Sequence, residues 1–290
     1  TLLAAMLLAL GLAGCGDSGK GGSAPTGPTV TITVTCETTT TTGGSVYVVG
    51  IDVGAATDLD AGETLTWTSP PGGSGTLQFS FSTLQPGAGG TIYTNPTVTL
   101  DLSVGAVRTG QGNVPTEVAS AASTQITLAS AAGLSVRAAH FTGPFNNSGP
   151  MPPRAESPTA YTVEWTVKNS SNAVANASVS TVLPTYVTFV AAQAGSTITY
   201  DAGSRTVRWD IGDLNAGVGY SAAARTGSFQ VSLNPSVSQV GQSPPLTGTA
   251  ALSGTDRFAQ VPISATAEAP TTKLVEAGFT GGMDIVAPKQ

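Results

Sequence analysis

The chain has 290 residues, enough for two domains of ordinary size. Only 10% of the residues are charged and 40% are hydrophobic, and the 36 glycines and 19 prolines are spread along the chain. This composition favours short strands and many turns over helices. The net charge is −6 and the sequence contains no cluster of basic residues, which argues against a nucleic-acid partner. Two cysteines, Cys15 and Cys36, do not make a disulfide framework.

The N-terminal segment has the pattern of an export signal. Leu2 to Leu12 is apolar apart from one glycine, which is the length of a signal-peptide core and too short to cross a bilayer. It ends in Leu12-Ala13-Gly14-Cys15, which resembles the lipobox of bacterial lipoproteins. The resemblance implies that residues 1–14 are removed and that Cys15 carries lipid. Residues 15–28, rich in Gly, Ser and Pro, then predict a flexible tether to the membrane.

Period-two alternation of apolar residues begins after this tether. Val30, Ile32 and Val34 alternate with threonines, and Leu77 and Phe79 alternate with polar residues. Such alternation predicts strands with one buried face and one solvated face. We therefore expect a first β-sandwich, of diverged immunoglobulin-like type, over residues 29–131.

A second set of strands follows over residues 132–272. Tyr161, Val163, Trp165 and Val167 share one face of a predicted strand, and seven or eight such strands alternate with turns. The expected fold class is all-β, with tandem immunoglobulin-like β-sandwiches after a lipoprotein signal peptide and tether.

Several motifs of the second set, in order and spacing, resemble the DUF11 repeat, an immunoglobulin-like module of prokaryotic surface proteins. They are Tyr161-Thr-Val-Glu-Trp-Thr-Val-Lys-Asn169, the Leu183-Pro184 step, and Val207-Arg-Trp-Asp-Ile-Gly-Asp-Leu-Asn-Ala-Gly217. The resemblance covers residues 133–268 and implies display outside the cell, with no catalytic residues to transfer. An internal repeat supports tandem modules, because Gly75–Phe81 mirrors Gly227–Leu233.

Aromatic residues are the first candidates for a binding surface. Trp165 and Trp209 could form a sugar-stacking platform, but both share the apolar side of their strands, which favours core packing. Our predicted structural core consists of four aromatic residues: Trp67, Trp165, Trp209 and Phe189. Tyr186 and Tyr220 lie in predicted loops and are better candidates for exposed contacts.

Catalytic and metal-binding patterns are sparse. His140, the one histidine, lies at a strand end before a Pro/Gly loop, which favours a structural or surface role over catalysis. Asp58, Asp60 and Glu63 offer oxygen ligands for Ca²⁺, but the EF-hand spacing fails, and a solvated acidic turn is favoured. We expect no cofactor and no metal beyond this calcium alternative. Asn169-Ser-Ser and Asn176-Ala-Ser match a glycosylation sequon, which we interpret as chance in a bacterial chain.

Two other segments carry predictions about organisation. The Pro-rich stretch 144–158 predicts an exposed loop. Residues 273–290 predict the first strand of a truncated third module, because Leu274–Gly281 ends in Phe-Thr-Gly, as does Leu134–Gly143, which opens the second module. The alternative is a closing strand of the second module.

The expected function is that of a non-enzymatic surface lipoprotein, lipid-anchored in the cell envelope and exposed outside the cytoplasm. Its modules would serve as a spacer, a structural element of the envelope or an adhesion element. The alternative is a module that binds a specific ligand, either a cell-wall polysaccharide or a surface protein. An enzyme comes third.

Overall fold

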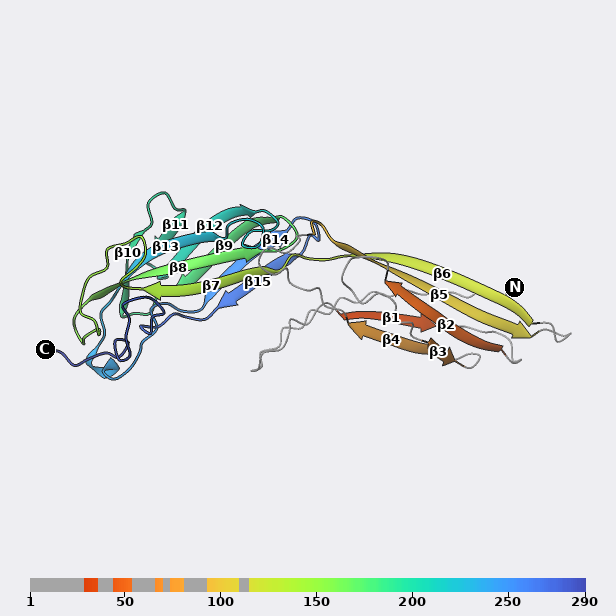
Figure 1. Ribbon diagram of the computed structural model, residues 1–290, viewed down its shortest axis with the longest axis horizontal. Coiled ribbons are helices and arrows are strands. Elements are labelled where there is room, and N and C mark those ends of the chain that lie inside the picture. The colour runs from red at the N-terminus through yellow and green to blue at the C-terminus, as the bar shows by residue number, and fades with distance from the viewer. Residues whose placement is uncertain (1–28, 36–43, 54–65, 70–73, 81–92, 110–114) are drawn as a thin grey trace. The chain divides into compact units, whose positions relative to one another are not determined.

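A computed structural model describes residues 29–35, 44–53, 66–69, 74–80, 93–109 and 115–290. Within these ranges the protein is all-β, and the one helical element is a 3₁₀ turn, η1, at Val237–Gln239. The chain divides into two units (Figure 1). The first contains the strands up to Ser80 together with residues 97–127, and the second contains Tyr93–Pro96 and Leu128–Gln290.

The first unit consists of two antiparallel sheets. One has the strand order β3-β2-β5-β6 and the other pairs β1 with β4. Val30 lies opposite Phe79 and Ile32 opposite Leu77, so the predicted alternating residues of two distant segments are paired in register. Trp67 lies in β3 opposite Val48. The strands are β1 (Thr29–Thr35), β2 (Gly44–Val53), β3 (Thr66–Ser69), β4 (Ser74–Ser80), β5 (Thr97–Thr109) and β6 (Pro115–Thr127).

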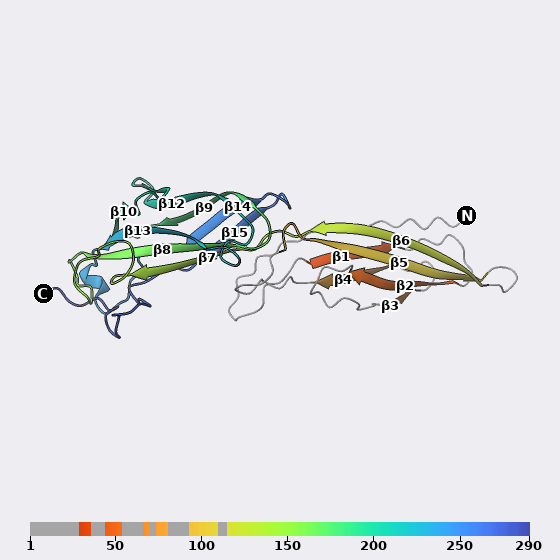
Figure 2. The same cartoon turned by 45° about the horizontal axis from the view of Figure 1, so that its top comes forward.

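The second unit is a β-sandwich of two antiparallel sheets, ordered β10-β13-β8-β7 and β11-β12-β9-β14-β15 (Figures 1 and 2). Across the first sheet, β7, β8, β13 and β10 occupy the A, B, E and D positions of an immunoglobulin sandwich, and in the second sheet β9, β14 and β15 occupy C, F and G. The order differs in one respect, because β10 precedes the extra strands β11 and β12. The strands are β7 (Ala132–Ala139), β8 (Thr159–Asn169), β9 (Val174–Val182), β10 (Val187–Ala192), β11 (Ile198–Asp201), β12 (Thr206–Leu214), β13 (Arg225–Leu233), β14 (Ala250–Asp256) and β15 (Pro262–Ala267).

Aromatic side chains fill the space between the two sheets. Trp165 of β8 is fully buried and Trp209 of β12 is 6% exposed. Their rings stack across the core with centroids 6.4 Å apart and planes 13° apart. Phe229 packs against Trp165 at 4.8 Å. Gly227 makes room for the Trp209 ring in this layer, because a Cβ atom at position 227 would lie 2.8 Å from the indole of Trp209.

Phe189 occupies the margin of the core rather than its centre. It is half-buried and stacks on Tyr200, with ring centroids 4.9 Å apart. The pairing of β10 with β13 shifts between Phe189 and Ala191, where a bulge interrupts the alternation of buried and exposed positions.

The boundary between the units falls between Thr127 and Leu128, close to the predicted one between Ala131 and Ala132. Ala131 is firmly held in the second unit. Its backbone N–H donates to Oγ of Ser170 at 2.8 Å, and its carbonyl accepts from the N–H of Ser170 at 3.0 Å.

The Pro-rich stretch 144–158 is exposed at several positions along its length but is also partly packed. The side chain of Asn147 donates to the carbonyl of His140 at 3.1 Å, and Pro153 and Ala155 are buried. The predicted exposed loop is therefore tied to the sandwich at several points.

Residues 273–290 form no strand, contrary to the prediction that they open a third sheet. They run as irregular chain over the second unit, with Leu274 and Val286 buried at 5% and 1% exposure. Gly278 and Gly282 have φ angles of +90° and +88°, which lie in the left-handed region and interrupt an extended strand. The repeated Phe-Thr-Gly sequence therefore does not mark a strand in residues 273–290.

We expect Trp209→Ala to lower the free energy of unfolding by about 3–5 kcal/mol, because it removes one of the two stacked indoles from the core. Chemical denaturation of the full chain, followed by circular dichroism, measures this change. Arg208→Ala is the matched control. It alters the adjacent residue on the exposed face, where its side chain is 52% exposed, and should change the free energy by less than about 0.5 kcal/mol. Equal stabilities for the two variants would contradict the core assignment of Trp209.

Candidate functional sites

Several sequence candidates lie outside the described residues. These are Cys15, Cys36, and the calcium candidates Asp58, Asp60 and Glu63. Within the described ranges, no group of three or more His, Cys, Asp and Glu side chains is placed to hold a metal ion. No helix of that part of the chain is long and apolar enough to span a bilayer.

His140 has structural neighbours. Its Nδ1 lies 2.8 Å from the carbonyl oxygen of Ala160, and since a carbonyl only accepts, Nδ1 carries the proton and donates. The ring packs edge-on against Phe141 and Tyr161, with centroids 5.0 and 5.6 Å away. Burial of Tyr161 raises the pKa of its phenol, and its hydroxyl faces the sulfur of Met151 at 3.6 Å. The surroundings of the imidazole are those of a packed ring at a strand end.

The two predicted exposed tyrosines are half-buried, which corrects that expectation. Tyr186 packs against the core, and burial raises the pKa of its phenol. Lys168 places its Nζ 5.8 Å from the ring centroid of Tyr220. The aromatic side chains most exposed in the second unit are instead Tyr93 and Phe141, at 48% and 46%.

The two sequons differ in accessibility. Asn169 is fully buried, so its side-chain amide is closed to any transferase. Asn176 is exposed but lies within β9.

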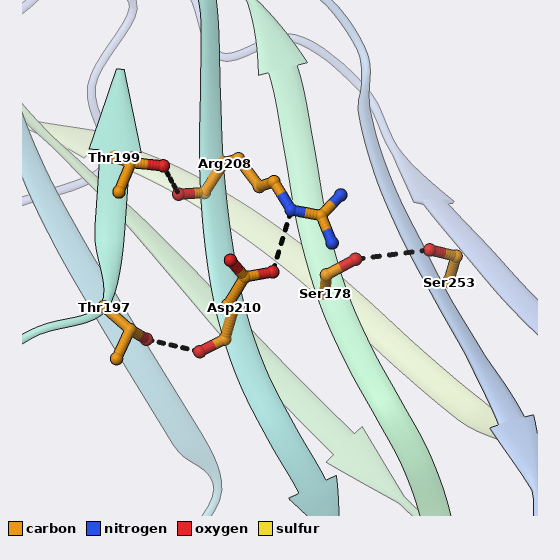
Figure 3. Close-up of polar contacts among 6 residues, drawn as sticks. All are labelled: Ser178, Thr197, Thr199, Arg208, Asp210 and Ser253. Atoms are coloured by element: carbon orange, nitrogen blue, oxygen red, sulfur yellow. Dashed lines mark hydrogen bonds and ion pairs between the residues drawn. The ribbon is translucent and has the colours of Figure 1, made fainter. Parts of the chain in front are cut away.

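The outward face of the five-stranded sheet carries small polar side chains (Figure 3). On β12, Nε of Arg208 donates to Oδ1 of Asp210 at 2.8 Å, and the guanidinium reaches toward β9. Ser178 and Ser253 lie within 3.4 Å across β9 and β14, and Thr197 donates to the carbonyl of Asp210. Most of these hydroxyls bond to the sheet itself, and the face displays no aromatic platform for a sugar ring.

A buried cluster at one end of the second unit, which we call the polar clasp, joins Ser130, Asn169, Asn172 and Asp256. Asp256 lies at the end of β14 and is fully buried. Its Oδ2 accepts from the N–H of Ser130 at 2.6 Å and from the side-chain amide of Asn172 at 2.8 Å. Its Oδ1 accepts from two backbone N–H groups at 2.8 Å each, those of Phe258 and Ala259.

These hydrogen bonds determine the charge of Asp256. Burial alone would raise the pKa of its carboxyl, but the donors of Ser130, Ala259, Asn172 and Phe258 outweigh burial and lower it. The carboxylate is therefore ionised at neutral pH, with four donors in place of water.

The asparagines of the clasp extend it to the segments that border the unit. Asn172 donates to the carbonyl of Leu128 at 2.7 Å, and its Oδ1 accepts from the N–H of Asn95 at 3.2 Å. Asn169 donates to the carbonyls of Asn172 and Asn215 at 2.7 and 2.9 Å, and its Oδ1 accepts from Ser130 at 2.7 Å. The clasp thus fixes both Tyr93–Pro96 and Leu128–Ala131 on the second unit.

Comparison with known proteins gives no family. No protein-family model matches the sequence, and no curated protein is significantly similar to it. Among solved structures, the chain is similar to the full-length major pilin SpaD from Corynebacterium diphtheriae, at 10% identity and a TM-score of 0.31, over 78% of this chain and 60% of the pilin. Two structures of BcpA, the major pilin subunit of Bacillus cereus, match at 6% and 7% identity with TM-scores of 0.30 and 0.28. Each match covers 78% of this chain and 64% of BcpA, so the chain spans less than two thirds of these pilins. TM-scores this low support no functional inference.

We expect Asp256→Asn to destabilise the second unit by about 2–4 kcal/mol, because an amide places N–H groups against donors and removes the charge that four hydrogen bonds stabilise. Denaturation at pH 7 measures the loss. Asp213→Asn is the control, since Asp213 pairs with Arg257 at an exposed site and its loss should change little.

The same variant carries a pH dependence. Because the folded-state pKa of Asp256 is lowered, its stabilisation is full above the unfolded pKa and is lost as pH falls through the folded value. The stability difference between parent and Asp256→Asn should therefore shrink below about pH 4. A difference that stays constant down to pH 3 would show that the charge of Asp256 does not contribute.

Proposed function

We propose that this chain is an exported lipoprotein, anchored by lipid on Cys15, whose DUF11-like second unit is a non-catalytic spacer or structural module of the cell envelope. The lipobox-like sequence Leu12-Ala13-Gly14-Cys15 supports the anchor, and the alternating strands support the module.

The observation that carries the structural role is the polar clasp. Asp256 is the most deeply buried carboxylate of the second unit, and both of its oxygens are occupied by donors of the chain itself. A ligand-binding or catalytic carboxylate needs an oxygen free to meet its substrate. Here the carboxylate positions the backbone, which is the property that a shape-keeping module requires.

Both ends of the second unit are held in this way. The clasp holds Leu128–Ala131 at its beginning, and near its end the N–H of Ala287 donates to the carbonyl of Pro153 at 2.8 Å. Attachment at both ends keeps the module folded when either terminus is pulled or bent, which suits a spacer.

The test is export of the chain in a bacterial host, behind a start codon and a basic leader. We expect the parent to incorporate labelled fatty acid and to partition into the detergent phase. Cys15→Ser should lose both properties, and Cys36→Ser, the matched control, should keep them. A Cys15→Ser chain that still partitions into detergent would contradict the lipid anchor.

The fate of the exported Cys15→Ser chain separates the spacer from the alternative. A spacer held only by lipid should appear in the medium. Retention on cell walls, with release by added wall polysaccharide, would instead indicate the ligand-binding module.

A further inference from the structure

The segment Lys273–Gly281, which we call the latch, lies over the end of β7 in the second unit. Its apolar side chains Leu274 and Phe279 pack against the core, and Leu274 is 5% exposed. Val275, between them, is 94% exposed. The latch therefore contacts the sandwich through a few side chains and not as a paired strand.

One carboxylate makes the polar attachment of the latch. Oε1 of Glu276 accepts from the N–H of His140 at 2.6 Å and from that of Phe141 at 3.2 Å. Its Oε2 accepts from the N–H of Thr142 at 3.0 Å and from the hydroxyl of Thr142 at 2.6 Å. Three consecutive backbone N–H groups thus form an anion-binding concavity for this carboxylate.

Within the described residues, these four are the hydrogen bonds that join the latch to residues before 270. The other bonds of the latch are local. Phe279 donates to the carbonyl of Glu276, Thr280 faces the sulfur of Met283, and Lys273 donates to Oγ1 of Thr271. The polar attachment therefore depends on a single titratable group.

The chain beyond the latch has its own attachments. Val286 is buried and its N–H donates to the carbonyl of Gln242 at 2.9 Å. Lys289 pairs with Glu156 at 2.5 Å. Release of the latch would therefore leave residues 284–289 in place as a second tether.

Hydrogen bonds, and not neighbouring charges, favour the ionised form of Glu276. Arg137 of β7 faces it while bound to Glu164 of β8 at 2.7 Å, and the imidazole of His140 is turned to Ala160. Within the C-terminal segment itself, Lys273 and Asp284 attract each other. Burial raises the pKa of Glu276, but the bonds from His140, Thr142 and Phe141 outweigh it and lower the pKa.

We propose that the latch is released by acid while the sandwich stays folded, because protonation of Glu276 removes the charge that strengthens four hydrogen bonds and turns one of its accepting oxygens into a hydroxyl. Release of the latch exposes the apolar surface, beside the end of β7, that Leu274 and Phe279 cover in the attached state. The direction of this pH dependence follows from the lowered pKa of Glu276. The attachment is complete above the ordinary carboxyl range and is lost as pH falls through the folded value. This device does not depend on the lipid anchor.

A nitroxide label at Val275→Cys, in a full-length chain carrying Cys15→Ser and Cys36→Ser, reports the mobility of the latch by electron paramagnetic resonance. Tryptophan fluorescence reports the core in the same samples. As pH falls from 7 to 3, we expect the label to become mobile before the fluorescence changes.

Glu276→Gln should give a mobile label already at pH 7, with unchanged fluorescence and no further response to acid. Asp213→Asn, the matched control, removes a carboxylate that pairs with Arg257 at an exposed site outside the latch and should behave as the parent. Thr142→Val removes one donor to the charged form, so release should move up by roughly 0.5–1 pH unit.

Three results would overturn the proposal. The first is a label in Glu276→Gln as immobile as in the parent. The second is global unfolding of Glu276→Gln at pH 7, or label and fluorescence changes at one common pH, since either would make the latch part of the cooperative core. The third is an unshifted release pH in Thr142→Val.

Discussion

The second unit depends on the contact of Trp165 with Trp209 across the two sheets. The indoles come from β8 and β12, which share no hydrogen bonds, so this packing and the surrounding core hold the sheets together. The contact requires Gly227, because any Cβ at that position would meet the Trp209 ring. Burial of apolar area is the main favourable contribution to folding, and aromatic rings supply the largest areas.

The ends of the sandwich are held instead by hydrogen bonds from backbone N–H groups to two carboxylates, and these carboxylates differ in how deeply they are buried. Asp256 and Glu276 both replace water with backbone N–H donors, and in both the hydrogen bonds outweigh burial in setting the pKa. Asp256 is fully buried and its donors come from segments that include the connection from Leu128, so its loss disturbs the folded unit itself. Glu276 is only half-buried and holds one short segment, so its attachment can be broken separately. Local stability differs within one domain when attachments differ in this way.

The sequence predicted the central layer better than the ends, for a physical reason. Alternation in Tyr161–Val167 and Val207–Ile211 places Trp165 and Trp209 on buried faces, because strand periodicity is local. The polar clasp joins Ser130 to Asp256, which are 126 positions apart, and no local pattern marks such a pair. The sequence marks Asn169 only as part of a sequon and of the repeat motif. No local sequence pattern predicts its buried hydrogen bonds. The Phe-Thr-Gly repeat was misleading because turn residues recur wherever the chain reverses, whether or not a strand follows.

The low charge content of the chain explains why so few carboxylates carry so much of the polar structure. With 10% of residues charged, the four ion pairs of the described residues lie on the surface, where solvent screens them and each contributes little. Backbone N–H groups at strand ends and in loops are unpaired donors that a sheet cannot satisfy by itself. A carboxylate that accepts hydrogen bonds from several of these N–H groups stabilises the fold more than a carboxylate paired with a lysine in water does. Each of its hydrogen bonds is charge-assisted and partly shielded from solvent. In this fold the main chain is therefore the principal partner of the two acidic side chains that lie buried or half-buried at the ends of the sandwich.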